Sequence, residues 1–399
     1  MNTLMRLPDW VRRNKTDMID DLTAYISRET PSDDKALLVS GLAWVEEWLQ
    51  HRIGEPVSRR FVDGGQWADT LVLDYPSDHG AQAWITALCH YDTVWPAGTL
   101  REWPVVVDGD RLTGPGAFDM KGGLVQLVWA LKASKELGLP RPNLRLVLNG
   151  DEEVGSPSSR QVIEAEVVRG NVVLAFEASA EGALKTARKG AGIFRVEVTG
   201  MEAHSGLDPE AGASAIDEIA RVIIQLHDET DLEKGTIVNV GIVQGGTRPN
   251  VKAGSAIAEV DIRVTSESEM HRMKGVLDRL TVRSPNASLV VSGDWTWPVM
   301  ARSMQTARLF AQAQDVADQL GFPLAETSVG GAGDANYVAA LGLPVLDGLG
   351  AVGAGAHARN EWISIDGMLE RTCLAAGLLA ALAEVPVQDA GPAVGASVS

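Results

Sequence analysis

The sequence predicts an α/β fold in which a mixed, mostly parallel sheet is flanked by helices and a smaller α+β domain is inserted into the chain. The first observation behind this prediction is a series of apolar runs, each typical of a buried strand, that end at or near a carboxylate or an imidazole. The second is a helical repeat of apolar residues over 124–131. The third is a segment, 190–293, in which strand and helix patterns follow in the order β-α-β-β-α-β.

The length of 399 residues indicates two domains, because a single hydrophobic core stops growing at about 250–300 residues. We predict a discontinuous domain over 1–188 and 295–399, interrupted by an inserted domain over 189–294. The order of elements in the insert is that of the ferredoxin-like split pattern. The composition of segment 385–399, rich in Ala, Gly, Pro, Val and Ser, predicts a frayed end. The elements predicted in the insert are a strand at 192–199, a helix at 213–226, strands at 236–243 and 256–264, a helix at 267–280 and a strand at 287–292.

Composition excludes several classes of function. The net charge of −18 argues against partners such as nucleic acid or an anionic membrane. No run of 18 apolar residues is present, so we expect no membrane span, and the first ten residues contain no apolar core of a secretory signal. Two cysteines, Cys89 and Cys373, do not make a disulfide framework. These features predict a cytoplasmic globular protein.

The most informative motif follows the apolar run 144–148, where Asp151, Glu152 and Glu153 are consecutive. Three carboxylates at the end of a buried strand repel one another and are costly to desolvate unless a cation neutralises them. An isolated Asp-Glu-Glu is more often a solvated acidic turn. Other stretches of the chain favour the interpretation that these carboxylates lie at a cation-binding site.

A second motif ends the apolar run 84–89 with His90 and Asp92. Side chains two apart on a strand share a face, so these two point the same way. An imidazole that binds a metal usually donates its other ring N–H to an oxygen, and Asp92 is placed to accept it. The alternative is a core histidine whose hydrogen bonds are satisfied.

Three more residues occupy similar places. Asp119 lies just before the helical pattern, Glu177 follows the apolar run 171–176, and His357 follows the glycine-rich stretch 353–356. For Asp119 the alternative is a helix N-cap. Open α/β sheets bind ligands at the carboxyl ends of their strands. Two histidines and three carboxylates are what two zinc ions that share one bridging carboxylate require.

These motifs resemble, in the same order, those of the co-catalytic di-zinc amidohydrolases that include glutamate carboxypeptidase, aminoacylase and succinyl-diaminopimelate desuccinylase. The resemblance spans about 84–365 and is closest to the glutamate carboxypeptidase-like branch. It implies that His90 and Glu177 hold one zinc ion, that Glu153 and His357 hold the other, and that Asp119 bridges them.

The same resemblance implies that Glu152 is the general base and that Asp92 orients His90. The implied reaction is hydrolysis of an amide bond, in an N-acyl amino acid or a peptide-like small molecule, by a water that bridges the zinc ions and is deprotonated by Glu152. Two Zn²⁺ ions per subunit are expected, although Co²⁺ and Mn²⁺ also suit carboxylate and imidazole ligands.

In the insert, His204 lies in a stretch that resembles the lid histidine motif of the family. The resemblance implies that it stabilises the oxyanion in the active site of a partner subunit, within a homodimer formed through the inserted domain. The alternative is a solvated loop histidine. Asn250, in a second stretch that matches the family, is either a polar contact to the substrate or a plain turn residue.

Three further residues are candidates for substrate binding. Arg263 either holds a substrate carboxylate or decorates a strand. Gly331 lies in a glycine-rich stretch, 329–336, that lets substrate approach the backbone, and that stretch lacks the Gly-Lys-Ser/Thr ending of a phosphate loop. Trp297 stands where the glutamate carboxypeptidase-like branch carries an arginine that grips the α-carboxylate. Because an indole cannot bind a carboxylate bidentately, we expect poor cleavage of substrates with a C-terminal glutamate. Trp95, Trp103 and Trp362, which lie close in sequence to proposed site residues, favour an aromatic or apolar substrate moiety, although most tryptophans are core residues in general.

Two other classes of function remain open. One is a metal-dependent aminohydrolase, or deaminase, on the same scaffold, which an ammonia assay distinguishes from amide hydrolysis. The other is a non-catalytic small-molecule binder, against which the complete set of site residues argues. The expected partners are a small amide or peptide substrate and a second copy of the chain.

Overall fold

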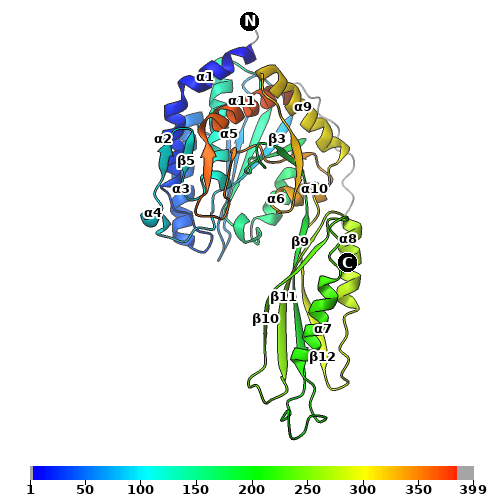
Figure 1. Cartoon of the computed structure of the whole chain (residues 1–399). Coiled ribbons are helices and arrows are strands. Elements are labelled where there is room, and N and C mark those ends of the chain that lie inside the picture. Colours follow the sequence, from blue (N-terminus) through cyan, green and yellow to red (C-terminus); the bar gives the residue numbers. More distant parts are fainter. Residues whose placement is uncertain (1–2, 384–399) are drawn as a thin grey trace. The chain divides into compact units, whose positions relative to one another are not determined.

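The computed structural model describes residues 3–383, in two compact units (Figure 1). Among the described residues, the first comprises 3–186, Arg302–Ser328 and 333–383, and the second comprises Ala187–Ala301 and Val329–Ala332. The sequence prediction set the boundaries at 188/189 and 294/295 and did not assign the short stretch Val329–Ala332 to the insert. The predicted frayed segment, 385–399, lies outside the described residues.

The first unit is built on a six-stranded sheet with the strand order β1-β2-β6-β3-β7-β14. Strand β3 pairs in parallel with both β6 and β7, and β14 pairs in parallel with β7, whereas β1–β2 and β2–β6 are antiparallel. The predicted mixed, mostly parallel sheet is therefore confirmed. Its strands are β1 Ser58–Val62, β2 Thr70–Tyr75, β3 Trp84–His90, β6 Asn143–Asn149, β7 Val172–Ala175 and β14 Val345–Leu346.

Two smaller sheets are also present, and the strands β8 and β13 each end within the residue ranges of the second unit. One pairs β8 with β13, and the other has the order β15-β16-β5-β4. Their bounds are β4 Val106–Asp108, β5 Arg111–Thr113, β8 Leu184–Arg188, β13 Glu326–Val329, β15 Gly353–Ala354 and β16 Trp362–Ser364.

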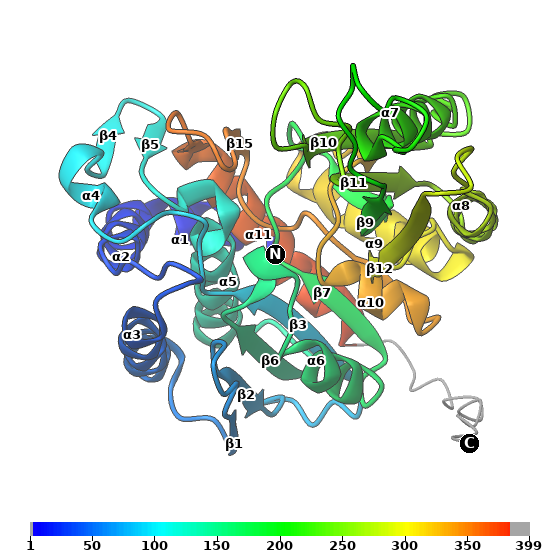
Figure 2. The ribbon, with the colours of Figure 1, turned by 90° about the horizontal axis from the view of Figure 1, so that it is seen from below.

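Helices flank the six-stranded sheet (Figure 2). The central helix, α5 (Gly122–Leu137), packs against α11 and also contacts α1, α2 and α3, while α6 packs against α10. The predicted apolar stripe of α5 is wider in the structure, since Leu124, Val125, Leu127 and Val128 are all fully buried, as in a helix surrounded by protein. The other helices of the unit are η1 Thr3–Arg6, α1 Leu7–Arg13, α2 Lys15–Ile26, α3 Lys35–Ile53, α4 Thr99–Glu102, η2 Ala117–Lys121, η3 Glu152–Val154, α6 Arg160–Val167, α9 Met304–Leu320, α10 Ala335–Ala340 and α11 Ile365–Leu382.

The second unit is a four-stranded antiparallel sheet with the order β10-β11-β9-β12. Along β11, residues alternate between buried and partly exposed, so that Ala258, Val260 and Ile262 face a core while their neighbours face away. Helix α7 packs on β9, β10 and β11 over that core. In chain order its elements are β9 Gly190–Thr199, α7 Ala215–His227, β10 Ile237–Gly245, β11 Ser255–Val264, α8 Glu267–Asp278 and β12 Ser288–Trp297.

Within residues 3–383, every helix is too short or too polar to cross a membrane. Both cysteines, Cys89 and Cys373, are buried and free.

Candidate metal centre

Three neighbouring parallel strands bring the predicted residues to one edge of the sheet. His90, the last residue of β3, pairs in register with Asn149, the last residue of β6. The turn that carries Glu152 and Glu153 follows β6, and Glu177 lies just beyond the end of β7. The carboxyl ends of parallel strands form the binding edge of an open α/β sheet. The shared register therefore gathers these side chains in one place.

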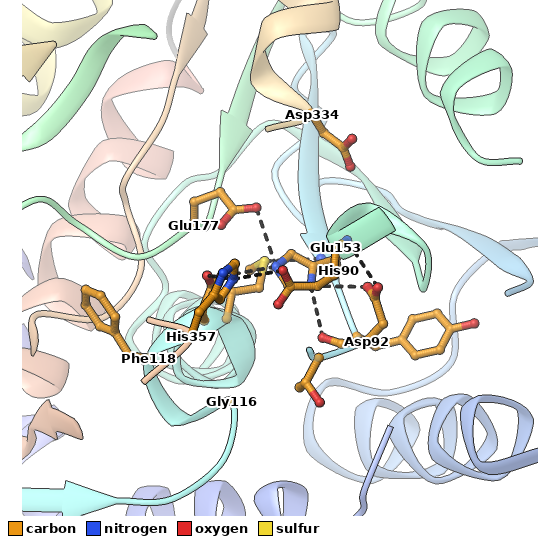
Figure 3. A network of polar contacts seen from close by, with 12 residues as sticks. His90, Asp92, Gly116, Phe118, Glu153, Glu177, Asp334 and His357 are labelled. Atoms are coloured by element: carbon orange, nitrogen blue, oxygen red, sulfur yellow. Dashed lines mark hydrogen bonds and ion pairs between the residues drawn. The ribbon is translucent and has the colours of Figure 1, made fainter. Parts of the chain in front are cut away.

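One candidate group for a metal ion comprises His90, Asp119 and Glu177. His90 and Glu177 are labelled in Figure 3, with a dashed line between them. The Nε2 atom of His90 lies 3.3 Å from Asp119 Oδ1 and 3.7 Å from Glu177 Oε1. Asp119 lies in η2 with backbone angles that are not helical, and the N-cap of α5 is Lys121. The alternative role of Asp119 as a helix N-cap is therefore wrong.

A second candidate group comprises Asp119, Glu153 and His357. The Nε2 atom of His357 lies 3.0 Å from Glu153 Oε2 and 3.5 Å from Asp119 Oδ2. The two oxygens of Asp119 thus face different histidines. In each group the potential ligand atoms all lie within 4.8 Å of one another.

These donor sets fit divalent metal ions. Each group offers one imidazole nitrogen and two carboxylates, a combination that suits Zn²⁺, Co²⁺ or Mn²⁺. His90 and Glu177 would hold one ion, Glu153 and His357 would hold the other, and Asp119 would touch both. The identity of the metal does not follow from these ligands, because all three ions accept them.

The electrostatics of the cluster also favour cations. Burial lowers the pKa of His90, but Glu177 and the hydrogen-bonded Asp119 outweigh burial and hold that pKa well above its usual range. Hydrogen bonds to Asp119 and Glu153 raise the pKa of His357 to about 10. For Asp119, burial raises the pKa, and hydrogen bonds from both histidines more than reverse that effect. The raised pKa values of the two histidines reflect the concentrated negative charge of the carboxylates, which is the feature that would favour a bound cation.

Glu152 belongs to neither group, although its neighbour Glu153 belongs to one. Burial, with a further contribution from Glu177, raises the pKa of Glu152 well above its usual range. A carboxyl whose pKa is moved towards neutrality is suited to accept and return a proton. Burial also raises the pKa of Glu153. The two adjacent glutamates therefore differ in that only Glu153 belongs to a candidate metal group.

Asp92 lies on the other side of the His90 ring. His90 Nδ1 is 3.3 Å from Asp92 Oδ1 and 3.1 Å from the Asp92 carbonyl oxygen. The second carboxylate oxygen of Asp92 accepts hydrogen bonds from Ser32 Oγ at 2.8 Å and from the backbone N–H of Glu153 at 3.2 Å. Asp92 thus has the geometry expected of a residue that orients a metal-binding imidazole.

The third carboxylate of the acidic motif has a different partner. Asp151 Oδ2 accepts hydrogen bonds from Ser158 N and Ser158 Oγ, each at 2.7 Å, and from Ser159 N at 3.1 Å. Asp151 therefore supports the turn before α6 and lies in neither candidate metal group. Three hydrogen-bond donors, and not a place in a candidate metal group, thus stabilise the charge of Asp151.

In the second unit, the structure brings together the loops that carry His204 and Asn250. The Ser205 N–H donates to the Asn250 carbonyl oxygen at 3.0 Å, and His204 forms a β-bridge with Val251. The exposed His204 accepts hydrogen bonds at Nδ1 from Gly206 N at 3.2 Å and from Leu207 N at 3.1 Å. With Nδ1 as an acceptor, the neutral ring carries its proton on Nε2, which is free to act as a donor.

The other substrate candidates of this unit differ in their surroundings. Arg263 forms a bidentate ion pair with Asp261, with distances of 2.8 and 2.9 Å, so a substrate carboxylate would have to displace Asp261. A Cβ atom on Gly331 would meet only Arg188 Nη1, at 3.9 Å, so packing within the described chain does not demand glycine there. The Nε1 atom of Trp297 is buried and has no hydrogen-bond partner among the described residues.

Two residues at the centre were missed by sequence reasoning. Asp334 accepts hydrogen bonds from Asn149 Nδ2 at 2.7 Å and from Ser156 Oγ at 2.5 Å, and so braces the turn that carries Glu152. Glu361 is fully buried and accepts hydrogen bonds from the loop that carries Asp119. The only signal in the sequence is that each acid lies within a few residues of a motif already singled out.

Known proteins share both the sequence and the architecture of this chain. Residues 88–381 match a family described as peptidase family M20/M25/M40. The chain is 29% identical to carboxypeptidase G2 of Pseudomonas sp. (strain RS-16) over 369 residues, which cover 91% of this chain and 88% of that protein. A tripeptidase from Staphylococcus aureus superposes with a TM-score of 0.80 at 19% identity, covering 93% of this chain and 99% of that one. A Bacillus subtilis protein described as a dinuclear metal-binding peptidase from the M20 family superposes with a TM-score of 0.66 at 14% identity, covering 94% and 99%.

Proposed function

The chain belongs to peptidase family M20/M25/M40 and is a hydrolase of that family, and from this premise we propose that it cleaves an amide bond in an N-acyl amino acid or a peptide-like small molecule with the aid of two metal ions. The family match confirms the resemblance inferred from the sequence motifs. The observation that carries the proposal is the placement of Asp119 between two histidines, each of which has its own second carboxylate.

In the proposed reaction, the acyl–nitrogen bond breaks, the oxygen of a water adds to the acyl carbon, and the amine leaves with a proton. Bound metal ions would polarise the carbonyl group and lower the pKa of water. His90 and Glu177 would hold one ion, Glu153 and His357 the other, and Asp119 both. Zn²⁺ is the proposed metal, with Co²⁺ or Mn²⁺ as alternatives.

Glu152 is the proposed general base. It accepts a proton from the attacking water and then delivers that proton to the leaving nitrogen. Its raised pKa supports this role, because a carboxyl that holds its proton more tightly is a stronger base once ionised. Asp92 would keep the His90 ring oriented with Nε2 towards Asp119 and Glu177, the residues that would share a metal ion with it.

His204 is the proposed donor to the developing oxyanion. Its support is the tautomer: two backbone N–H groups occupy Nδ1 and leave a proton on Nε2. Asn250, whose loop is hydrogen bonded to the His204 loop, is the proposed polar contact to substrate. Gly331 and Trp297 remain proposed substrate contacts, whereas the ion pair with Asp261 argues against Arg263.

We also propose a homodimer that forms through the second unit and shares each active site between subunits. Strand β10 lies at the edge of its sheet and exposes Ile242 and Val243, which are 54% and 57% accessible. An exposed apolar edge strand promotes aggregation, and a partner subunit that covers the strand prevents it. The free thiols of Cys89 and Cys373 support the proposed cytoplasmic location.

A substrate panel tests the proposed function. Metal-loaded full-length protein is incubated with N-acyl amino acids and dipeptides, and both products are quantified by mass spectrometry, with Glu152→Gln as the inactive control. Appearance of equal amounts of the acid and the amine product supports the proposal. Release of ammonia without cleavage between two carbon-bearing fragments would instead indicate an aminohydrolase, and no turnover of any amide by the metal-loaded protein would contradict the proposal.

A further inference from the structure

The carboxylate shared by the two candidate metal groups, that of Asp119, is carried by a buried loop that packs against α2, α5, β3 and β16. Residues 114–122 include Gly114, Gly116 and Gly122, and Gly116 has a positive φ of 73°. Asp119 has non-helical backbone angles within η2. Within this loop the N–H groups of Ala117 and Lys121 donate to the carbonyl oxygens of Gly114 and Gly116. The other buried N–H groups of an irregular loop need partners from elsewhere in the chain.

Glu361 supplies those partners. Its Oε1 accepts hydrogen bonds from Phe118 N at 2.8 Å and from Asp119 N at 3.0 Å, and its Oε2 accepts one from Gly116 N at 3.0 Å. The same Oε2 accepts a fourth bond from Trp95 Nε1 at 2.9 Å. The side chain is fully buried. One carboxylate therefore accepts from three backbone donors of the loop that presents Asp119. Two of these donor residues, Gly116 and Phe118, are labelled in Figure 3.

Glu361 is also joined to the loop that presents His357. The Ala358 N–H donates to the Gly355 carbonyl oxygen, and the Glu361 N–H donates to the Ala358 carbonyl oxygen, each at 2.9 Å. A Cβ atom on Gly355 would meet Glu361 Cα at 2.9 Å, so these two backbones are in close contact. His357 thus lies on a compact turn that ends at Glu361.

We propose that Glu361 is a positioning residue for the metal centre, whose carboxylate holds the Asp119 loop in register with the His357 turn. This inference rests on the proposed function, because Glu361 is proposed to position the ligands of the proposed metal centre. Glu361 itself would touch neither metal nor substrate. Ligand geometry must be held within about 0.5 Å for a site to work. A glutamine has only one acceptor oxygen, and its NH₂ group would face backbone N–H donors, so Glu361→Gln would release part of the loop.

The test compares metal binding by three variants of the full-length protein. Zn²⁺ affinity is measured by competition with a chromogenic chelator, and the absorption spectrum of the Co²⁺-loaded protein reports ligand geometry. Burial raises the pKa of the Glu361 carboxyl to about 7, so the measurements are made at pH 8, where the carboxylate form predominates. Glu218→Gln is the matched control, because Glu218 is also buried and accepts bonds from two backbone N–H groups, of Arg283 and Ser284, in the other unit.

Glu361→Gln is expected to weaken Zn²⁺ binding by roughly 10–100-fold, the range seen when a residue that supports a metal ligand is removed. It should also change the Co²⁺ spectrum, while Glu218→Gln leaves both unchanged. Trp95→Phe removes only the fourth donor and spares the backbone contacts, so a change of at most a few-fold is expected. If Glu361→Gln does not fold, Glu361→Asp, which keeps the charge but shortens the reach, is measured with the same expectation.

The experiment distinguishes failure of the proposed function from failure of the inference about Glu361. If the wild-type protein binds no metal, the proposed function fails. If the wild-type protein binds two ions and the Glu361 variants bind them with unchanged affinity and an unchanged Co²⁺ spectrum, showing only a lower melting temperature like Glu218→Gln, then Glu361 merely stabilises the fold and the inference is overturned. An effect of Trp95→Phe as large as that of Glu361→Gln would also contradict it.

Discussion

The carboxylate of Asp92 accepts a hydrogen bond from the backbone N–H of Glu153 at 3.2 Å. The residue that faces His90 Nδ1 therefore also anchors the turn that presents a ligand of the other candidate group. Through this one carboxylate the ends of β3 and β6 are held together at the centre. Asp92 is consequently expected to influence both metal ions and not only the ion held by His90.

Asp92→Asn tests that expectation. Asparagine has one acceptor oxygen, so it cannot present an oxygen both to His90 Nδ1 and to the Glu153 N–H, and it removes the negative charge that lies 3.3 Å from His90 Nδ1. Metal affinity or turnover should therefore fall by roughly 10–100-fold. Stoichiometry measured by elemental analysis should decline at both sites. Ser32→Ala is the control, because it removes only the Ser32 hydroxyl from the same carboxylate oxygen. Equal effects of the two substitutions would argue against a specific role for the Asp92–His90 contact.

The adjacent glutamates should respond differently to the same substitution. Glu152→Gln removes the proposed base and keeps the shape, so turnover should fall by roughly 10²–10⁴-fold with nearly unchanged metal content. Glu153→Gln should instead deplete one metal ion, because Glu153 belongs to a candidate metal group and Glu152 does not. Turnover and bound metal are measured on the same preparations. The opposite pattern would show that the roles of the two neighbours are reversed.

Trp297 should disfavour a substrate with a C-terminal glutamate. Its indole offers one buried N–H and cannot form a bidentate contact with a carboxylate. We expect a higher kcat/KM for bulky apolar acyl amino acids than for acyl-glutamates. Trp297→Arg should improve acyl-glutamate cleavage by about tenfold, the scale of one hydrogen bond to a charged group, whereas Trp297→Phe should not. Efficient cleavage of acyl-glutamates by the wild-type protein would remove the reason to single out Trp297.

The proposed sharing of active sites can be tested by mixing two inactive variants. His204→Ala should lose roughly 10²–10³-fold in turnover, as removal of one oxyanion donor does elsewhere, with both metals retained. If His204 acts on its partner's site, a heterodimer of His204→Ala and Glu152→Gln subunits has one site with both defects and one with neither. About half of the wild-type activity per heterodimer should then return. No recovery, with subunit exchange verified independently, would exclude a shared site.

The sequence predicted the residues at strand ends well, because a parallel strand carries its last side chains to an edge that its neighbours share. His90 and Glu177 follow apolar runs that became β3 and β7. The roles of the three consecutive carboxylates could not be distinguished from their position after a strand. Nothing in their order distinguishes Asp151, which caps a turn, from Glu153, which belongs to a candidate metal group.

Residues that accept hydrogen bonds from donors far away in the sequence were not predictable. Glu361 accepts from the backbone N–H of Asp119, 242 positions away, and Asp334 accepts from the side-chain Nδ2 of Asn149, 185 positions away. A backbone donor has no signature in a sequence, so an acid that binds one resembles any other acid. The wider burial of α5 was missed for a related reason. An apolar repeat identifies one buried face of a helix, whereas the helices packed around α5 determine how many of its other residues are also buried.

The most direct test of the account is anomalous diffraction at the zinc edge from crystals of the zinc-loaded full-length protein. Two peaks are predicted, one within bonding distance of His90 and Glu177 and one within bonding distance of Glu153 and His357, each at about 2.0–2.2 Å from its ligands. Both peaks should contact the carboxylate of Asp119. A single peak, or two peaks of which neither contacts Asp119, would contradict the two-metal centre on which the proposed hydrolysis depends.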